Sequence, residues 1–480
     1  MPRILFTADF DMEKSNRAVN LIKGLVIVIV AVLIVVGIDK IFLLKSEDGI
    51  SQMESVYLQK DNTVDVLFLG NSHVYCDIAT GVLWDNYGMA AFDLGGAEAP
   101  SWVSYYHLKE TLKTQKPKLV CFETSVAALF PTLYQSDSWT ADNNYGMKAG
   151  ENRLEQLKVN SEETDFRKRI FPLSIMHGRY TDLCENDFKD VKNTISYKGF
   201  DPREGIVPME TPVFSPDTPP VACSEKAEEY TRKIIELCRD NDIPIMIFVS
   251  PYIIEDSHQA IYNYIFEIAS EYDVPCINFN EMYGEIGLDF GRDMADVSHL
   301  NYYGNYKFTD FFGNLIKTYY DIPDRRGDEN FASWEEDAAN QRMDRNSFKF
   351  FFAFEDPDSF IEAFSNDGYD VFITIKTGID NGLNEASSAA FERIGIPREK
   401  QLSGNAFVIK NQEIVAELTS GFRYSISEEE NELLFIEEGE GDYYHSVSLF
   451  VDDEEHKEDY GNVVYVYDTV NKMFVIAQRL

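Results

Sequence analysis

The longest uninterrupted hydrophobic run lies near the start of the chain. Every residue from Gly24 to Ile38 is apolar or glycine, and with its apolar flanks the segment reaches about 20 residues, enough to cross a bilayer. We predict a polar tail over residues 1–23 and a membrane-spanning anchor over residues 24–44. Basic residues precede the run, which places the tail in the cytoplasm and the rest of the chain outside. The alternative is a cleaved signal peptide, which fits less well because no A-x-A-like cleavage site follows.

Short apolar runs alternate with helical patterns in the next part of the chain. After a polar tether predicted over residues 45–60, this alternation continues over residues 61–322, with an irregular, acidic insertion expected at residues 131–215. Strands that are apolar on both faces are typical of a parallel sheet covered by helices on both sides. The strands are predicted at residues 64–70, 90–95, 117–123, 243–250 and 274–278, and the helices at residues 101–114, 226–241, 257–272 and 306–320.

The pattern changes in the last third of the chain. Residues 323–347 are highly charged and are predicted to be a linker, and residues 348–480 read as a separate α+β accessory domain. Its predicted elements are strands at residues 348–354 and 369–377, helices at residues 358–366 and 382–394, and several strands up to the C-terminus.

Composition narrows the class of partner. The formal net charge of −39 argues against a nucleic-acid partner, because a polyanion would be repelled. None of the 6 cysteines forms a C-x-x-C pair, and the histidines show no ligand spacing, so no metal or cofactor is expected.

Two polar motifs flank the predicted parallel sheet in sequence. Gly70-Asn71-Ser72 directly follows the first strand, and Asp296-Val297-Ser298-His299 follows the last one. Because ligands of open α/β sheets bind at the carboxyl ends of the strands, we expect Ser72 and His299 to meet there. Each motif alone is common, but their order and placement together indicate one site.

Their chemistry suits nucleophilic catalysis. A serine hydroxyl attacks efficiently only when a neutral imidazole takes its proton, and a carboxylate on the other ring nitrogen fixes the tautomer. Ser72, His299 and Asp296 can fill these three roles. The backbone N–H groups of Ser72 and Gly95 are our candidates for the oxyanion hole, because the start of a helix after Ser72 offers unpaired donors.

The same residues resemble a known superfamily. Strand–Gly-x-Ser, Asp93-Leu94-Gly95-Gly96 and Asp296-x-x-His299-Leu-Asn are similar to the SGNH/GDSL hydrolases over about residues 61–322. Residues 68–75, 83–88 and 176–180 more closely resemble membrane-anchored bacterial SGNH-like proteins. The resemblance implies a flavodoxin-like three-layer α/β/α sandwich and ester chemistry, with Ser72 as nucleophile, His299 as base and Asp296 orienting it.

The C-terminal region carries a second, fainter resemblance. Residues 369–376, 391–396 and 405–409 resemble the interleukin-like EMT-inducer domain, which accompanies some extracytoplasmic glycan enzymes. A chance likeness between short strand–helix–strand segments is the simpler explanation. In either case the expected role is accessory or binding, because the region holds no visible catalytic cluster.

One position departs from the superfamily pattern. SGNH enzymes place an oxyanion-hole asparagine after the third strand, where this chain has Glu123 followed by Thr124 and Ser125. Loss of such a donor costs on the order of 10²–10³ in rate. The side chains of Asn71, His73 and Thr124 are the alternatives, and the negative charge of Glu123 has the wrong sign unless it is protonated or binds Arg179.

Further candidate substrate contacts surround these residues. His73 follows the serine, and either touches substrate or bonds locally at the helix start. His177 and Arg179 lie in the predicted insertion, where a structural ion pair is favoured over an anion clamp.

Three functions therefore follow from the sequence. The first is a membrane-anchored extracytoplasmic serine esterase acting on O-acyl groups of an envelope or exported polysaccharide. The second is an O-acyltransferase, which implies a membrane-bound acyl donor protein as partner. The third is a non-catalytic protein that binds a glycan or another partner, which the missing asparagine favours.

Overall fold

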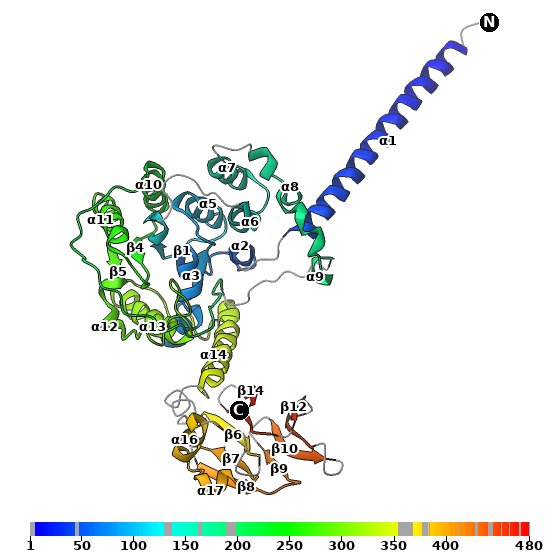
Figure 1. Ribbon diagram of the computed structural model, residues 1–480. Helices are drawn as coiled ribbons and strands as arrows, with labels where there is room; N and C mark the ends of the chain where they lie inside the picture. Colours follow the sequence, from blue (N-terminus) through cyan, green and yellow to red (C-terminus); the bar gives the residue numbers. More distant parts are fainter. Residues whose placement is uncertain are drawn as a thin grey trace. The chain divides into compact units, whose positions relative to one another are not determined.

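In the computed structural model the chain forms two compact units, Met1–Trp334 and Glu335–Leu480 (Figure 1). The boundary lies inside the predicted linker. The described residues are 5–43, 48–128, 137–161, 166–188, 198–353, 368–376, 383, 385–411, 413–427, 431–439, 445–452, 454–459, 461–469 and 472–479.

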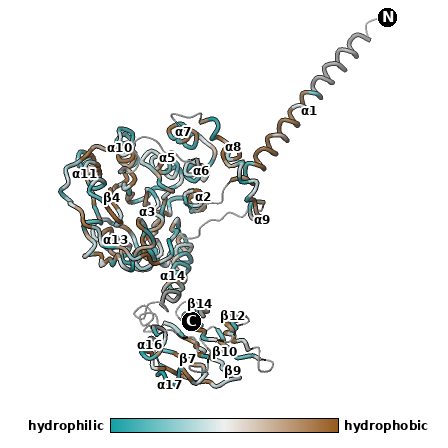
Figure 2. Tube along the Cα trace, viewed as in Figure 1, coloured by the Kyte–Doolittle hydropathy of each residue, from teal (hydrophilic) through white to brown (hydrophobic). Residues whose placement is uncertain are grey.

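The first unit begins with one long helix, α1 (Leu5–Phe42). Its segment Val19–Phe42 is the one helical stretch of the described residues that is long and apolar enough to cross a membrane. Figure 2 shows this stretch as a nearly continuous hydrophobic band. By length and composition it fits a membrane anchor or a signal sequence.

A parallel sheet forms the centre of the first unit. Its five strands lie in the order β2-β1-β3-β4-β5, which is the flavodoxin-like order. The residues of β1 to β4 are buried throughout, so the apolar runs are explained by cover on both faces. The predicted parallel α/β arrangement is confirmed, and the strands are β1 (Val66–Gly70), β2 (Ala91–Gly95), β3 (Leu119–Glu123), β4 (Ile245–Val249) and β5 (Cys276–Asn278).

Helices cover the sheet on its two faces (Figure 1). On one face, Phe312 of α13 (Tyr302–Tyr319) contacts Phe68 and Phe248, with ring centroids 5.5 and 5.0 Å apart. Edge-to-face contacts of this kind add to the free energy gained by burial alone. The same face holds α3 (Ser72–Asp77) and α4 (Thr80–Tyr87), and the other face holds α5 (Ser101–Thr111), α10 (Glu225–Asp240) and α11 (Asp256–Ser270).

The expected polar tether is wrong, because this segment belongs to the body. Residues Ile50–Val56 form helix α2, and Ile50 and Met53 are buried. The polar residue Gln52 is buried too, and its amide donates to the carbonyl of Gly199 at 3.3 Å. The polar residues of this segment suggested that it is exposed to solvent. The sequence does not show that Gln52 pairs with a backbone group far away in the chain.

The expected insertion contains short helices. They are α6 (Asp137–Asn144), α7 (Glu151–Asn160), α8 (Pro172–Met176) and α9 (Glu185–Phe188), with 3₁₀ turns η2 (Phe166–Arg169) and η3 (His177–Thr181). Residues 201–215 are without regular structure, as expected.

Helix α14 (Ala332–Ala353) covers part of the predicted linker and most of the predicted strand at residues 348–354. The strand prediction is wrong, because the described residues of this segment are helical. Trp334, Ala338 and Gln341 are buried and lie at the i, i+4, i+7 spacing of one helix face. The many charges around them concealed this pattern.

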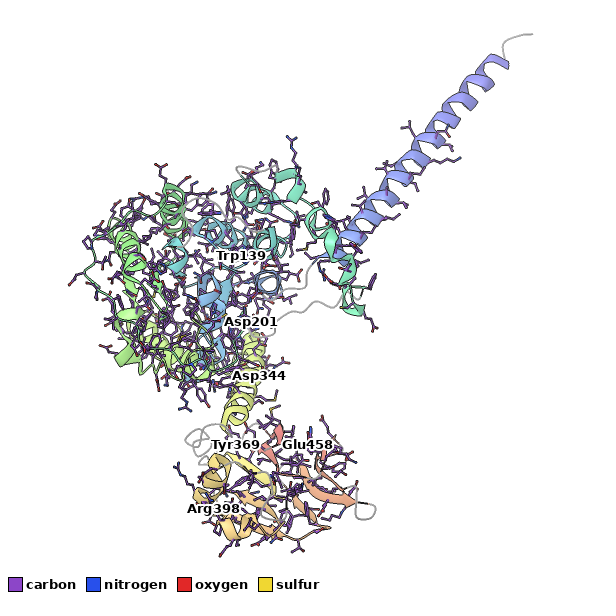
Figure 3. The ribbon with its side chains drawn as sticks, viewed as in Figure 1. Trp139, Asp201, Asp344, Tyr369, Arg398 and Glu458 are labelled. Atoms are coloured by element: carbon purple, nitrogen blue, oxygen red, sulfur yellow. The ribbon has the colours of Figure 1, made fainter. Side chains whose placement is uncertain are left out.

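The second unit is built from two antiparallel sheets, ordered β14-β13-β6-β7-β8 and β12-β11-β10-β9. Phe372 and Val408 pack against Phe435 in one core, and Val371 packs with Phe391 of α16 in another. Tyr369, labelled in Figure 3, begins β6. The predicted strand at 369–377 and helix at 382–394 are found, and residues 358–366 lie outside the described part.

The elements of the second unit are β6 (Tyr369–Thr374), α16 (Glu385–Arg393), α17 (Arg398–Gln401), β7 (Ala406–Lys410), β8 (Glu413–Leu418), β9 (Arg423–Ser427), β10 (Glu432–Gly439), β11 (His445–Val451), β12 (Glu454–Asp459), β13 (Val463–Asp468) and β14 (Met473–Arg479).

Candidate active site

A tight turn at the carboxyl end of β1 presents Ser72. Gly70 has φ +156°, and a Cβ there would lie 2.8 Å from the Cβ of Glu123, so only glycine fits. Asn71 then caps α3, because its Oδ1 accepts a hydrogen bond from the backbone N–H of His73 at 2.8 Å. Ser72 is therefore the first residue of α3, at the edge of the sheet where we expected it.

A short loop before α13 presents Asp296 and His299. An antiparallel bridge between Met294 and Leu300 closes the loop. Inside it, Asp296 Oδ1 accepts from the backbone N–H groups of Ser298 at 2.7 Å and His299 at 2.9 Å. Asp77, at the far end of α3, accepts from the N–H of Leu300 at 2.9 Å and so ties the loop to the serine helix.

The two segments meet in a continuous hydrogen-bonded chain. His299 Nε2 lies 2.9 Å from Ser72 Oγ, and His299 Nδ1 lies 2.9 Å from Asp296 Oδ2. These distances are those required for a nucleophile, a base and an orienting carboxylate. The structure thus brings these three side chains together, and their catalytic roles stay a prediction.

Burial, together with two nearby positive charges, favours the neutral form of His299. Burial lowers the pKa of His299, and the nearby charges of His73 and Arg203 lower it further, against the opposing effect of Asp296. Burial alone would raise the pKa of Asp296, but the hydrogen bonds from His299 and from two backbone N–H groups bring it well below its usual range. The pair is therefore set as neutral imidazole and carboxylate near pH 7.

Arg203, which lowers the pKa of His299, was not predicted from the sequence as part of the site. Its guanidinium donates to Asp48 Oδ1 at 2.6 Å and to Asp201 Oδ2 at 3.4 Å, and Asp201 is labelled in Figure 3. The hydroxyl of Tyr75 on α3 also donates to Asp48 Oδ1, at 3.1 Å. Asp48 and Arg203 come from the predicted tether and the predicted insertion, and no local motif marks either residue.

Glu123, where the superfamily places asparagine, lies in a closed network. Its carboxylate accepts from the side-chain amide of Asn71 at 2.5 Å, from the N–H and hydroxyl of Ser125 at 3.1 and 2.9 Å, and from the N–H of Ser250 at 3.3 Å. The side chain is fully buried. These contacts join the ends of β1, β3 and β4, so the candidate substrate contact at Glu123 has instead a structural role.

The Asn71 side chain is not available as an oxyanion donor. One amide hydrogen goes to Glu123, and Nδ2 also lies 2.9 Å from Ser125 Oγ. The structure thus contradicts our expectation for this side chain. Gly95 stands next to Gly70 at the end of β2, and a Cβ there would lie 2.5 Å from the carbonyl oxygen of Asn71.

His73 and Thr124 remain as side-chain candidates for the oxyanion donor: both are buried, and His73 lies beside the triad. Its Nδ1 is 3.2 Å from Ser125 Oγ and 3.7 Å from Glu123 Oε1, and its ring contacts the ring of His299 edge-to-face at 5.5 Å. Burial alone would lower the pKa of His73, but the carboxylate of Glu123, with Asp77 and Asp296, raises it above the usual value. The two neighbouring histidines therefore have pKa values displaced in opposite directions.

His177 and Arg179 are not brought to the triad. His177 is exposed in η3. Arg179 donates to Asp187 Oδ1 at 2.8 Å and to the carbonyl of Phe42 at 2.8 Å. Arg179 therefore forms a structural ion pair next to the end of α1 and does not bind Glu123.

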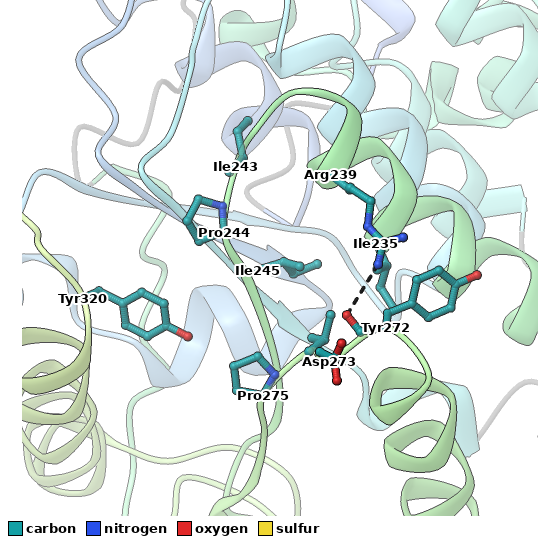
Figure 4. A pocket seen from close by; sticks show the side chains of 10 residues that line it. Ile235, Arg239, Ile243, Pro244, Ile245, Tyr272, Asp273, Pro275 and Tyr320 are labelled. Carbon is teal, nitrogen blue, oxygen red and sulfur yellow. Dashed lines mark hydrogen bonds between the residues drawn. The ribbon is translucent and has the colours of Figure 1, made fainter.

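A groove of about 320 Å³ lies at the amino-terminal ends of β4 and β5 (Figure 4). Pro244 and Pro275, which line it, precede β4 and β5, whereas Ser72 follows β1. The groove thus lies away from the triad. Within the described ranges, no group of three or more His, Cys, Asp or Glu side chains is placed to hold a metal ion.

Comparison with known proteins adds little. No family model matches the chain, and no curated protein sequence does. A similar solved structure is that of an acetyl xylan esterase, AlAXEase, which is 12% identical and covers 53% of this chain and 98% of its own, with a TM-score of 0.27. Similarity at this level does not indicate a function.

Proposed function

We propose that the chain is a membrane-anchored, extracytoplasmic serine esterase of the SGNH type, acting on O-acyl groups of an envelope or exported polysaccharide. The observation that carries the proposal is the hydrogen-bonded chain from Ser72 Oγ through His299 to Asp296. The superfamily motifs at these positions support the class, and the apolar helix α1 supports the location.

The proposed reaction has two halves. Ser72 Oγ attacks the acyl carbonyl while His299 Nε2 takes the hydroxyl proton, and Asp296 stabilises the resulting imidazolium. The tetrahedral intermediate collapses, His299 returns the proton to the departing sugar oxygen, and acyl-Ser72 remains. Water, deprotonated by the same imidazole, then releases the carboxylic acid and restores the serine.

The oxyanion of each intermediate needs donors. We assign this role to the backbone N–H groups of Ser72 and Gly95. For the missing asparagine we assign the Nε2–H of His73, since its Nδ1 already faces Ser125 and Glu123. A charged donor can replace a neutral amide, because hydrogen bonds from cations to oxyanions are stronger.

An O-acyltransferase uses the same triad and differs in the acceptor, a sugar hydroxyl in place of water. The membrane helix favours this alternative, because it would hold the site near a membrane-bound acyl donor protein.

The test compares the full chain in detergent with Ser72→Ala and with the control Ser257→Ala, an exposed serine at the start of α11. We expect hydrolysis of p-nitrophenyl acetate to fall at least about 10³-fold in Ser72→Ala and to stay unchanged in the control. Release that rises with an oligosaccharide acceptor, with acylated sugar detected by mass, supports the transferase. Equal release by all three proteins, or no labelling by a fluorophosphonate, supports the binding protein.

A further inference from the structure

The end of α1 is fastened to the body of the first unit. Asp39, near the end of α1, accepts from the backbone N–H of Leu173 in α8 at 2.7 Å. Arg179 of η3 donates to the carbonyl of Phe42, the last residue of α1. These contacts place α8 and η3 within one turn of the point where the apolar stretch ends.

The chain also re-enters the body soon after α1. Asp48 accepts from the backbone N–H of Ala97 at 2.6 Å and from Arg203 at 2.6 Å. Leu43 and Asp48 are five residues apart, which limits their Cα separation to roughly 18 Å. No long tether therefore separates the apolar helix from the body.

Large aromatic side chains are exposed next to this junction. Phe171 is 51% exposed, Tyr180 70% and Phe188 65%. They lie just before α8, in η3 and at the end of α9, and α8, η3 and α9 all contact α1. Two exposed basic residues, Arg167 and Lys168, precede them in a chain whose net charge is −39.

We infer that the surface formed by residues 166–188, named here the juxtamembrane surface, rests on the lipid headgroups. Aromatic side chains concentrate at membrane interfaces, and basic side chains are attracted to anionic lipids. Continuity with the end of α1 identifies the bilayer as the occupant of this surface. The inference rests on the proposed membrane anchoring, and it bears on the proposed reaction because Asp48, six residues after the end of α1, accepts from Tyr75 on the helix of Ser72.

Tryptophan quenching in liposomes tests the inference on the full chain. Trp84, Trp102 and Trp334 are buried and Trp139 is half-buried, so the quenching measured in the parent protein is the baseline subtracted from that of each variant. The test variants are Phe171→Trp and Tyr180→Trp, and the matched control is Tyr319→Trp, whose parent residue is 76% exposed on α13. Leu33→Trp, within the apolar stretch, reports insertion of α1.

We expect brominated lipids to remove most of the emission added at positions 33, 171 and 180, and little of that added at position 319. Quenching at position 33 without quenching at 171 and 180 overturns the juxtamembrane surface and leaves the anchor intact. The absence of quenching at position 33 overturns both proposals. Equal quenching at 319 and 171 shows non-specific adsorption and also overturns the inference.

Discussion

Two adjacent histidines with opposite environments dominate the site at the scale of single residues. The pKa of His299 is lowered and that of His73 is raised, although their rings are in contact. A base must be neutral to accept a proton, whereas a charged donor must be protonated. Because the two pKa values are displaced in opposite directions, His299 can be neutral and His73 protonated at the same pH.

The lowered pKa of His299 sets the acidic limb of activity. Because His299 stays neutral to lower pH than an ordinary histidine, we expect the acidic limb of kcat/KM to lie below about pH 6.5. Arg203→Gln removes a positive charge that lowers this pKa, so the limb moves up. Asp296→Asn removes a charge that raises it, so the limb moves down while kcat falls by up to about 10⁴-fold. The pH profile of p-nitrophenyl acetate hydrolysis measures these shifts, and an unmoved limb in both variants argues against His299 as the base.

The proposed role of His73 predicts that activity also declines at basic pH. If its imidazolium donates to the oxyanion, activity declines as the pH rises through its raised pKa. We expect His73→Ala to lose about 10²–10³ in kcat. His73→Asn supplies a neutral amide, so it is expected to recover part of the rate and to lose the basic limb. If both variants keep the wild-type profile, His73 is not a donor.

Glu123 acts at the scale of elements, because it joins the ends of three strands. Glu123→Ala leaves several buried donors without a partner, at about 1–3 kcal/mol each. We expect a large fall in the melting temperature, and a smaller one in Glu123→Gln, which keeps one acceptor oxygen. Thermal unfolding followed by circular dichroism measures both. Equal stability of wild type and Glu123→Ala contradicts the role given to this network.

Helix α2 provides a second test at this scale. Met53 is 1% exposed, so Met53→Ala is expected to cost about 2–5 kcal/mol in the free energy of unfolding. Leu58→Ala, at a position 58% exposed, is the matched control and is expected to change little. If the two variants are equally stable, the segment is the polar tether that its sequence suggests.

Some of the helices and strands could be predicted from the sequence, and others could not. The five strands and the Ser72, Asp296 and His299 motifs were predictable, because a strand buried on both faces is continuously apolar and a turn needs glycine. Helices α2 and α14 were hidden because charged and polar residues outnumber their buried positions. Arg203 was hidden because its contacts join segments far apart in the sequence.

At the scale of the whole molecule, the chain forms two units with separate cores. Such chains commonly depart from two-state unfolding. We expect two thermal transitions, with Met53→Ala lowering only one and Phe435→Ala, in the core of the second unit, lowering only the other. Differential scanning calorimetry separates them, and a single transition shifted by both variants contradicts independent units.

The network around Glu123 also has a consequence for how this site can change over generations. Placing an asparagine at position 123 by one substitution would remove a carboxylate on which Asn71, Ser125 and Ser250 all depend. The intermediate would carry the stability loss before any catalytic gain from a new donor. The present arrangement therefore resists a single substitution to asparagine at this position, whereas substitutions around His73 leave the network in place.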